Sequence, residues 1–323
     1  MPHKRYIFLL LMMSIGAIGT AQEDYPVEIL KNRQLQLKVY PPDIEHGFYR
    51  AARFDWAGVV GSVKFNNHEF IGHWLDAHDP LNHESVTGPV EAFSPIGYED
   101  CSPGETFLII GVGWLEKPDE RPYHFATPYK IADNGTWSVE KKKREIRFVQ
   151  KLQDHSGISY QYTKIIKLLE NEPGFVLEHE LLNTGAKELD GTVYNHNFFI
   201  IDDEPTGPNI ETNFPYPILA EGRGFGDMIS ARDSSLHFTR PLQKGESVYT
   251  SNIEGYEDIA EDYKINMENL KTGAGINIHA DRPLDKLAYW ACHSTACPEP
   301  FIAISVAPGE TFTWSITYEF YAK

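Results

Sequence analysis

Cysteine is scarce in this sequence, which contains only Cys101, Cys292 and Cys297 in 323 residues. Small folds that depend on a disulfide framework need a much higher density of cysteine, so that class of protein is excluded. One bridge is still permitted, and Cys292 and Cys297 in "CHSTAC" are close enough in sequence to close a short loop. A zinc site there is disfavoured, because the two thiols and His293 leave the fourth ligand unassigned.

Basic residues are also few, with 29 Lys and Arg against 46 Asp and Glu and a formal net charge of −17. A surface this acidic repels nucleic-acid phosphates and anionic lipid. We therefore expect no nucleic-acid partner and no attachment to a membrane surface.

Long apolar runs are absent except at the N terminus, where residues 6–19 follow two basic residues and precede small ones. This run is shorter than the roughly 20 residues that span a bilayer. We interpret residues 1–21 as a secretory signal that is cleaved after Ala21, with an uncleaved anchor as the alternative. The protein is then expected to be periplasmic or secreted, with a net charge of −19 after Lys4 and Arg5 are lost.

Helical periodicity is missing as well, and short segments with alternating polar and apolar residues take its place. Residues 22–323 contain no linker, repeat or composition shift, so we expect one domain and a monomer or dimer. The sequence predicts an all-β protein built as a large antiparallel β-sandwich. The clearest predicted strands are 35–40, 107–115, 146–152, 158–169, 175–183 and 311–321.

The stretch "TVYNHNFFIID" begins at Thr192 and places one histidine in a row of aromatic residues. On a strand, Tyr194, His196 and Phe198 share one face. We expect the preceding strand, 175–183, to form a hairpin with this one, so that His196 sits on a rigid sheet. The histidine is either a catalytic group or a buried, hydrogen-bonded core residue.

A second candidate is Glu299, which stands between two prolines in "CPEPFIAISVAPGE". Prolines on both sides restrict the backbone and remove two hydrogen-bond donors, so this carboxylate is held with little conformational freedom. The alternative is an ordinary acidic residue of a surface turn.

These segments resemble the aldose 1-epimerases and the wider galactose mutarotase-like superfamily. The likeness is carried, in order, by "LNTGAKELDGT", "YNHNFF", "AGINIHADRPLDKLAYWAC" and "CPEPFIAISVAPGETFTWSITYEF". The resemblance implies a large twisted sandwich, the galactose mutarotase-like supersandwich. It also implies an isomerase that needs no cofactor or metal, with His196 as general acid and Glu299 as general base.

The resemblance extends less clearly to the residues that bind the substrate. We expect Arg53, Glu91, Tyr98, Asn195 and Asp202 to contact a monosaccharide or oligosaccharide. The family's second histidine has no clear match, and His83 is the substitute we consider. Tryptophans that could stack on a sugar are Trp56, Trp74, Trp114 and Trp290.

The function we predict is that of an exported aldose 1-epimerase-like protein, which interconverts sugar anomers by opening and reclosing the ring. One alternative is a carbohydrate-binding protein without catalysis. Another is a polysaccharide lyase or glycoside-processing enzyme on the same fold. A metal site at His68, His73, His78 and His83 is disfavoured, because a spacing of five matches neither a strand face nor a helix stripe.

Overall fold

The computed structural model describes residues 25–323, and the predicted signal, residues 1–21, lies outside the described residues. Within that range the chain forms strands and two short 3-10 turns, η1 (Ile201–Asp203) and η2 (Ala260–Asp262), with no α-helix. Residues 25–323 contain no helix with the length and apolar character of a membrane span. The predicted all-β class is confirmed.

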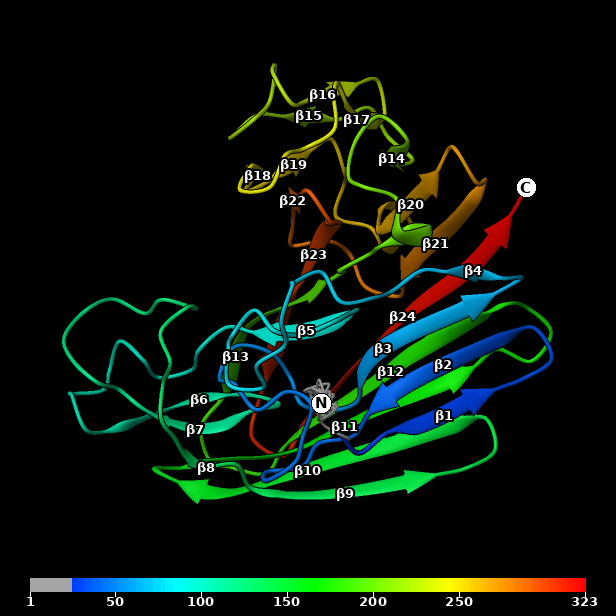
Figure 1. Cartoon of the computed structure of the whole chain (residues 1–323). Helices are drawn as coiled ribbons and strands as arrows, with labels where there is room; N and C mark the ends of the chain where they lie inside the picture. Colours follow the sequence, from blue (N-terminus) through cyan, green and yellow to red (C-terminus); the bar gives the residue numbers. More distant parts are fainter. Residues whose placement is uncertain (1–24) are drawn as a thin grey trace, which may run out of the picture.

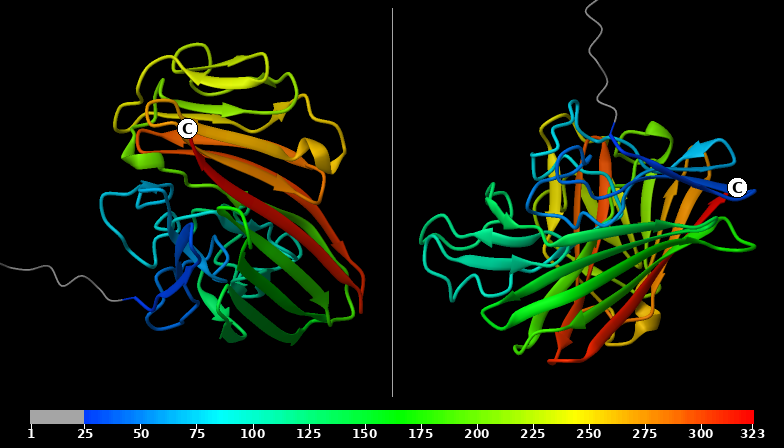
Figure 2. Two further views of the ribbon diagram at one scale, coloured as in Figure 1. Left: turned by 90° about the vertical axis from the view of Figure 1, so that its right-hand side faces the viewer. Right: turned by 90° about the horizontal axis from the view of Figure 1, so that it is seen from below.

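The largest element is a twisted antiparallel sheet of ten strands, which runs through the whole molecule (Figures 1 and 2). In spatial order its strands are β16 (Ile229–Arg232), β17 (Ser235–Phe238), β14 (Ile210–Asn213), β20 (Lys264–Asn269), β21 (Ala274–Ala280), β24 (Thr311–Ala322), β12 (Gly174–Asn183), β11 (Ile158–Leu168), β10 (Glu145–His155) and β9 (Thr136–Lys141).

Smaller sheets cover this one. The five-stranded sheet has the order β18 (Ser247–Thr250), β22 (Lys286–Cys292), β23 (Thr295–Val306), β13 (Leu189–His196) and β5 (Val90–Phe93). A four-stranded sheet contains β1 (Glu28–Lys31), β2 (Leu35–Tyr40), β3 (Val59–Phe65) and β4 (His68–Glu69). The remaining sheets are β6 (Thr106–Ile109), β7 (Gly113–Glu116) and β8 (Ile131–Asp133), and the pair β15 (Leu219–Ala220) and β19 (Ile253–Glu254).

Most predicted strands match observed ones within a few residues, but the predicted strand 107–115 is wrong as a single element. It is a hairpin, in which β6 pairs antiparallel with β7. The turn contains Gly111 and Gly113, both with positive φ. A Cβ atom on Gly111 would lie 2.5 Å from the Asp55 carboxylate. The chain therefore needs glycine here to reverse close to another buried side chain.

The predicted hairpin that leads into the His196 strand is also wrong. β12 pairs with β11 and β24 of the large sheet, whereas β13 pairs with β23 and β5 of the five-stranded sheet. The turn at 184–188 therefore carries the chain from one layer of the sandwich to the other. Both strands alternate polar and apolar residues, and that pattern does not specify which sheet each strand joins.

Cys292 and Cys297 are free thiols in the structure. They lie on β22 and β23, but in different cross-strand pairs, because Cys292 faces Thr295 and Cys297 faces Trp290. The sequence permitted a disulfide between them, and the register of this hairpin leaves both cysteines unpaired.

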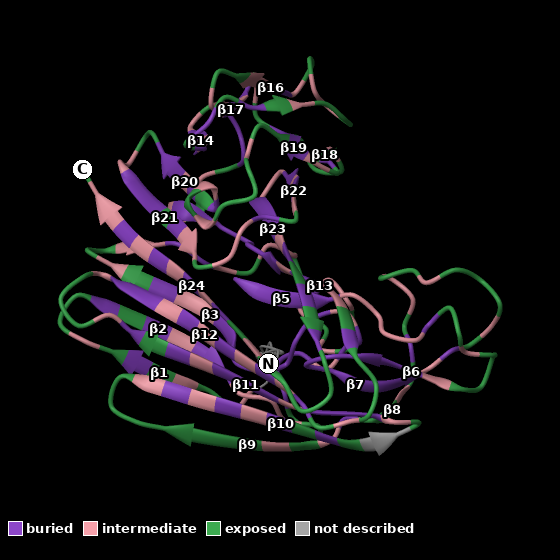
Figure 3. Ribbon diagram, turned by 180° about the vertical axis from the view of Figure 1, so that it is seen from behind, coloured by how far each residue is buried: buried purple, intermediate pink, exposed green. Residues whose placement is uncertain are grey.

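The core between the layers is apolar and close-packed, and alternating buried and exposed positions mark the strands that enclose it (Figure 3). A charged group of side chains lies within it. Lys164 of β11 is fully buried and makes ion pairs with Glu91 of β5 and with Asp55, the latter at 3.7 Å. His179 of β12 contacts the other Glu91 oxygen, Oε1, at 2.9 Å. We call Asp55, Glu91, Lys164 and His179 the core charge cluster, and it links the two layers.

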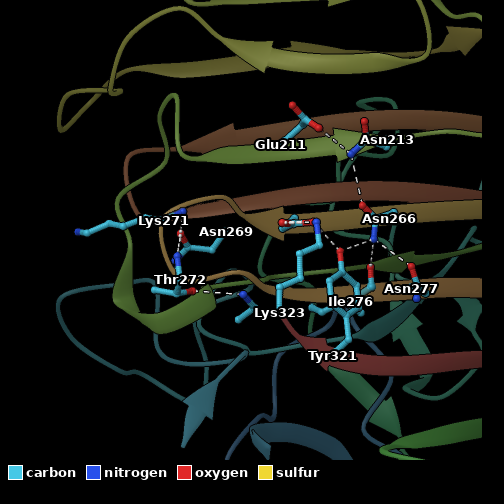
Figure 4. A network of polar contacts seen from close by, with 12 residues as sticks. Glu211, Asn213, Asn266, Asn269, Lys271, Thr272, Ile276, Asn277, Tyr321 and Lys323 are labelled. Atoms are coloured by element: carbon cyan, nitrogen blue, oxygen red, sulfur yellow. Dashed lines mark hydrogen bonds and ion pairs between the residues drawn. The ribbon is translucent and has the colours of Figure 1, made fainter. Parts of the chain in front are cut away.

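A second polar group lies on the outer end of the large sheet (Figure 4). Side-chain amides form a row across three strands, in which Asn213 donates to Asn266 at 3.3 Å and Asn266 donates to Asn277 at 2.9 Å. Asn266 also donates to the Tyr321 hydroxyl on β24 at 2.9 Å. These bonds join β14, β20, β21 and β24 on a side that the apolar core does not cover, and so help to hold their register.

Candidate functional site

A pocket of about 510 Å³ opens where the five-stranded sheet meets the loops around it. Its wall is rich in aromatic rings, and its polar groups are few and mostly charged. The lining residues are Arg53, Trp74, Glu84, Phe125, Tyr194, His196, Phe198, Arg223, Tyr249, Trp290, Glu299 and Phe301. This size and composition match a site for a small molecule.

His196 is the last residue of β13, and its backbone pairs with Val90 of β5. Its imidazole stacks on the Phe198 ring with 3.8 Å between centroids, and Phe54 meets it edge-on. The side chain is 3% exposed, and Nδ1 has no hydrogen-bond partner among the described residues. The predicted sharing of one face by Tyr194, His196 and Phe198 is confirmed, since all three line the pocket.

Glu299 enters the pocket from β23, opposite Ala288 of β22. The pairing between β13 and β23 ends at Tyr194 and Phe301, just before the prolines on either side of Glu299. Proline cannot donate to a sheet ladder. The Pro-Glu-Pro sequence therefore fits the part of β23 that no longer pairs with β13. In this part of the strand the Glu299 carboxylate reaches the pocket.

The two side chains meet, with 3.4 Å between His196 Nε2 and Glu299 Oε1. This exceeds the ~2.9 Å of a good hydrogen bond, so the contact is weak in this geometry. Burial raises the pKa of Glu299 to about 7, although Arg53 and Lys286 oppose that shift. Burial, together with the nearby Arg53 charge, lowers the pKa of His196 well below 6.5. Both shifts favour a neutral imidazole beside a carboxyl group that titrates near pH 7.

Arg53 also lines the pocket, as the sequence analysis placed it. Its guanidinium lies between the rings of Phe54 and Phe125, at 4.5 and 4.2 Å from their centroids. Nη2 donates to the Tyr194 hydroxyl at 3.2 Å, and no carboxylate among the described residues lies within ion-pair distance. The aromatic contacts hold a cation in the wall without neutralising it.

Glu91 and Asn195, which we expected to bind substrate, do not line the pocket. Glu91 is fully buried in the core charge cluster, where it accepts a hydrogen bond from Asn195 Nδ2 at 3.0 Å. Asn195 points there because successive side chains on a strand face opposite ways, so its neighbour His196 takes the pocket face. Both residues stand behind the site rather than in it.

Tyr98 and Asp202 lie elsewhere too. Tyr98 is buried against Phe107 and donates its hydroxyl hydrogen to the Arg121 carbonyl at 2.9 Å. Asp202, at the end of the His196 segment, contacts His68 Nδ1 at 2.8 Å and accepts from the Glu69 amide. The expected groove positions of Tyr98 and Asp202 are therefore wrong, because each is engaged in a local structural contact.

The pocket contains two of the predicted tryptophans and several residues that were not predicted. Trp74 and Trp290 line the pocket, whereas the other two candidate tryptophans, Trp56 and Trp114, are buried core residues. His83 is not a lining residue, and its ring lies 6.0 Å from that of Phe125. Residues that no motif pointed to are Glu84, Phe125, Arg223, Tyr249 and Phe301. Glu84, Phe125 and Arg223 come from loops, and Tyr249 comes from the edge strand β18, where periodicity carries no signal about the site. Phe301 lies on β23, in the middle of the five-stranded sheet.

Across residues 25–323, no three His, Cys, Asp or Glu side chains gather closely enough to hold a metal ion. In the histidine row, His68 contacts Asp202, and the His78 ring stacks on Phe48.

Comparison with known proteins finds similarity in structure only. No protein-family model matches the chain, and no curated protein matches it. A galactose mutarotase-like protein from Lactobacillus casei ATCC 334 aligns with a TM-score of 0.55 and 14% identity, over 92% of this chain and 100% of that one. A galactose mutarotase related enzyme from Lactobacillus acidophilus gives 0.53 and 12%, over 92% and 97%.

An aldose epimerase homologue from C. elegans gives a TM-score of 0.53 and 11% identity, over 93% of this chain and 99% of that one. Such low identities concern the architecture and carry no information about activity. The chain has the fold of the galactose mutarotase-like β-sandwich proteins.

Proposed function

We propose that this protein is an aldose 1-epimerase-like isomerase that accelerates the exchange of sugar anomers outside the cytoplasm. The observation that carries the proposal is the meeting of His196 and Glu299, from distant parts of the chain, in one aromatic pocket. Aromatic walls suit the apolar faces of a sugar ring, and two titratable groups suit its two reacting oxygens.

The reaction needs one group to give a proton to the ring oxygen while the other takes one from the anomeric hydroxyl. The ring opens, the carbonyl end rotates, and closure returns the protons. Between pH 7 and the lower pKa of His196, the pair holds one proton between its two members. That state contains both a donor and an acceptor, so the cycle needs no cofactor or metal.

The pKa directions favour the form in which this proton rests on Glu299. Glu299 is then the donor in ring opening and His196 the acceptor, whereas the resemblance to the epimerases implies the reverse. Infrared difference spectroscopy of the wild type and Glu299→Gln at pH 6 tests this, because the protonated carboxyl band that the substitution removes belongs to Glu299. The band of Asp55, whose pKa burial also raises to about 7, should remain in both proteins. No loss of protonated carboxyl signal in Glu299→Gln would restore the implied roles.

The function itself is tested by exchange NMR of monosaccharides at anomeric equilibrium, across hexoses, pentoses and uronic acids. The purified protein is expected to broaden or cross-saturate the anomeric signals of at least one sugar. If no sugar in the panel exchanges faster than in buffer, the isomerase proposal fails.

A second candidate is a binding protein without catalysis. It is favoured by one observation, that His196 is the only histidine lining the pocket among the described residues, whereas the resemblance implies a second one. Thermal stabilisation by a sugar that shows no accelerated exchange would select this candidate.

A further inference from the structure

The charge around the pocket differs in sign from that of the whole chain. The protein carries a formal net charge of −17. The pocket wall nevertheless contains two arginines, Arg53 and Arg223, against the acids Glu84 and Glu299. A third cation, Lys286, lies 3.9 Å from the centre of the Phe301 ring, which is part of the wall. With Glu299 protonated, two arginines line the pocket, Lys286 lies against the Phe301 ring of its wall, and one acid remains.

None of these cations makes a direct ion pair among the described residues, although the charge of Glu299 interacts with Arg53 and Lys286 from a longer distance when it is ionised. Within residues 25–323, no carboxylate lies within 4 Å of the charged nitrogens of Arg53, Arg223 or Lys286. Arg53 and Arg223 are notable because both line one pocket, and Lys286 lies against the wall of the same pocket. By contrast, Glu84 lies at the rim with a 43% exposed side chain and a histidine neighbour at 3.6 Å.

Arg53 is the most constrained of the three. Two aromatic rings hold its guanidinium, and its one side-chain hydrogen bond among the described residues goes to Tyr194. This arginine is half-buried, and its buried Nε has no hydrogen-bond partner among the described residues. Such spare donors favour an anion, because charge-assisted hydrogen bonds are stronger than neutral ones. Arg223 approaches from a loop on another side, with its guanidinium 6.0 Å from the centre of the Tyr249 ring.

We propose that the substrate is a reducing sugar that carries an anionic group, either a carboxylate or a phosphate. This inference rests on the proposed function, because it places the substrate in the same pocket. The aromatic rings contact the sugar ring, Glu299 and His196 face its anomeric end, and the cations bind the anionic substituent. An anion is accepted there although the acidic surface as a whole repels one.

The test compares each anionic sugar with its neutral parent. Anomer exchange is measured by NMR for galacturonate and galactose, for glucuronate and glucose, and for glucose 6-phosphate. The expected kcat/KM is at least about tenfold higher for an anionic sugar than for its parent, as one charge-assisted contact provides. A preference for uronates alone identifies a carboxylate, and a preference for the phosphate alone identifies a phosphate.

Arg223→Gln is the main variant, because this exposed side chain can be changed without disturbing the core. It should lower kcat/KM for the anionic sugar by roughly 10- to 100-fold, and lower that for the neutral parent less. Arg232→Gln, an exposed arginine outside the pocket, is the matched control and should change neither. Arg53→Lys adds a variant that keeps the charge but loses the fork of donors.

The outcomes separate this inference from the function on which it rests. Equal kcat/KM for anionic and neutral sugars would overturn the anionic substrate and leave the isomerase standing. Melting temperatures raised by uronate or sugar phosphate but not by the neutral parent, without any exchange, would overturn the isomerase and support anion binding. If no sugar shows accelerated exchange and no sugar raises the melting temperature, both ideas fail.

Discussion

Two histidine–glutamate pairs lie in this molecule, one in the core and one in the pocket, and they differ in what surrounds them. In the core pair, His179 and Glu91 are 2.9 Å apart, and the buried Lys164 occupies the other carboxylate oxygen. In the pocket pair, His196 and Glu299 are 3.4 Å apart and no cation contacts the carboxylate directly. All four side chains are less than 10% exposed.

The protonation of the two carboxyl groups follows from that difference. Burial alone would raise the pKa of Glu91, but the Lys164 charge and the His179 hydrogen bond outweigh it and lower the pKa to about 2. Burial also acts on Glu299, and with weaker compensation its pKa rises to about 7. Glu91 is thus a structural anion because Lys164 and His179 both contact it directly, whereas Glu299 has no such contact with a cation and can hold a proton. Asp55 lies farther from the same lysine, at 3.7 Å, and burial raises its pKa to about 7.

The largest expected effect is on the pocket pair. Glu299→Gln keeps the shape of the side chain but cannot exchange a proton, so catalysed anomer exchange should fall by roughly 10²- to 10⁴-fold. Exchange NMR on the preferred sugar measures the change. Exchange at the wild-type rate in this variant would remove Glu299 from the mechanism.

The next effect concerns the core pair. Lys164→Met removes the one cation and leaves Glu91 and Asp55 as uncompensated buried acids, so the free energy of unfolding should fall by about 3–5 kcal/mol. Urea denaturation measures it. Lys167→Met on the same strand is the matched control. That lysine is exposed and pairs with Glu178 on the surface, so its loss should change the stability by at most about 1 kcal/mol.

If Lys164→Met lowered the free energy of unfolding no more than Lys167→Met does, the core charge cluster would not stabilise the fold, and its contrast with the pocket pair would fail.

We expect Glu299 to lower the stability of the protein at the pH where it supports activity. Glu299 has a folded pKa of about 7 against 4.5 when free, so the wild-type protein loses stability as the pH rises through this interval. At pH 8 the inactive Glu299→Gln variant should therefore be more stable by up to about 3 kcal/mol. Below pH 4 the gain should vanish, because both states of the wild type are then protonated.

Glu91 has the opposite sign and serves as the comparison. Its folded pKa is lowered to about 2, so its contribution is present above pH 4.5 and is lost as the pH falls through 2. Glu91→Gln should therefore destabilise the protein at pH 8, where Glu299→Gln stabilises it. Chemical denaturation of both variants at pH 8 and below pH 4 measures these changes in the free energy of unfolding. A loss of stability at pH 8 in both variants would contradict the contrast between the two glutamates.

The smallest effect is the pH dependence of the rate. Above about pH 7 the pocket pair loses its single proton, so kcat/KM should fall about tenfold per pH unit. Below the lowered pKa of His196 the pair gains a second proton, and the rate should fall again. A rate that rises steadily from pH 6 to pH 9 would show that another group controls the reaction.

Predictions from the sequence were correct where a property depends on residues that are close together in the chain. The alternation along residues 192–200 identified the face that carries His196, and the prolines around Glu299 marked an unusual strand. It failed for Glu91 and Tyr98, which have the polar character of groove residues but make contacts inside the protein. Local sequence cannot distinguish these cases, because the partners come from strands distant in the chain.

The sequence by itself determined the all-β class and most of the strands, because both depend on side-chain periodicity within a few residues. Local pattern left two interpretations open for His196 and for Glu299, and the resemblance to the aldose 1-epimerases singled them out as a pair. Only the tertiary structure decided that β12 and β13 belong to different layers and that Arg53 and Arg223 reach one cavity. It also decided which buried glutamate has a lysine beside it, because the protonation of a carboxyl group depends on charges that only folding brings close.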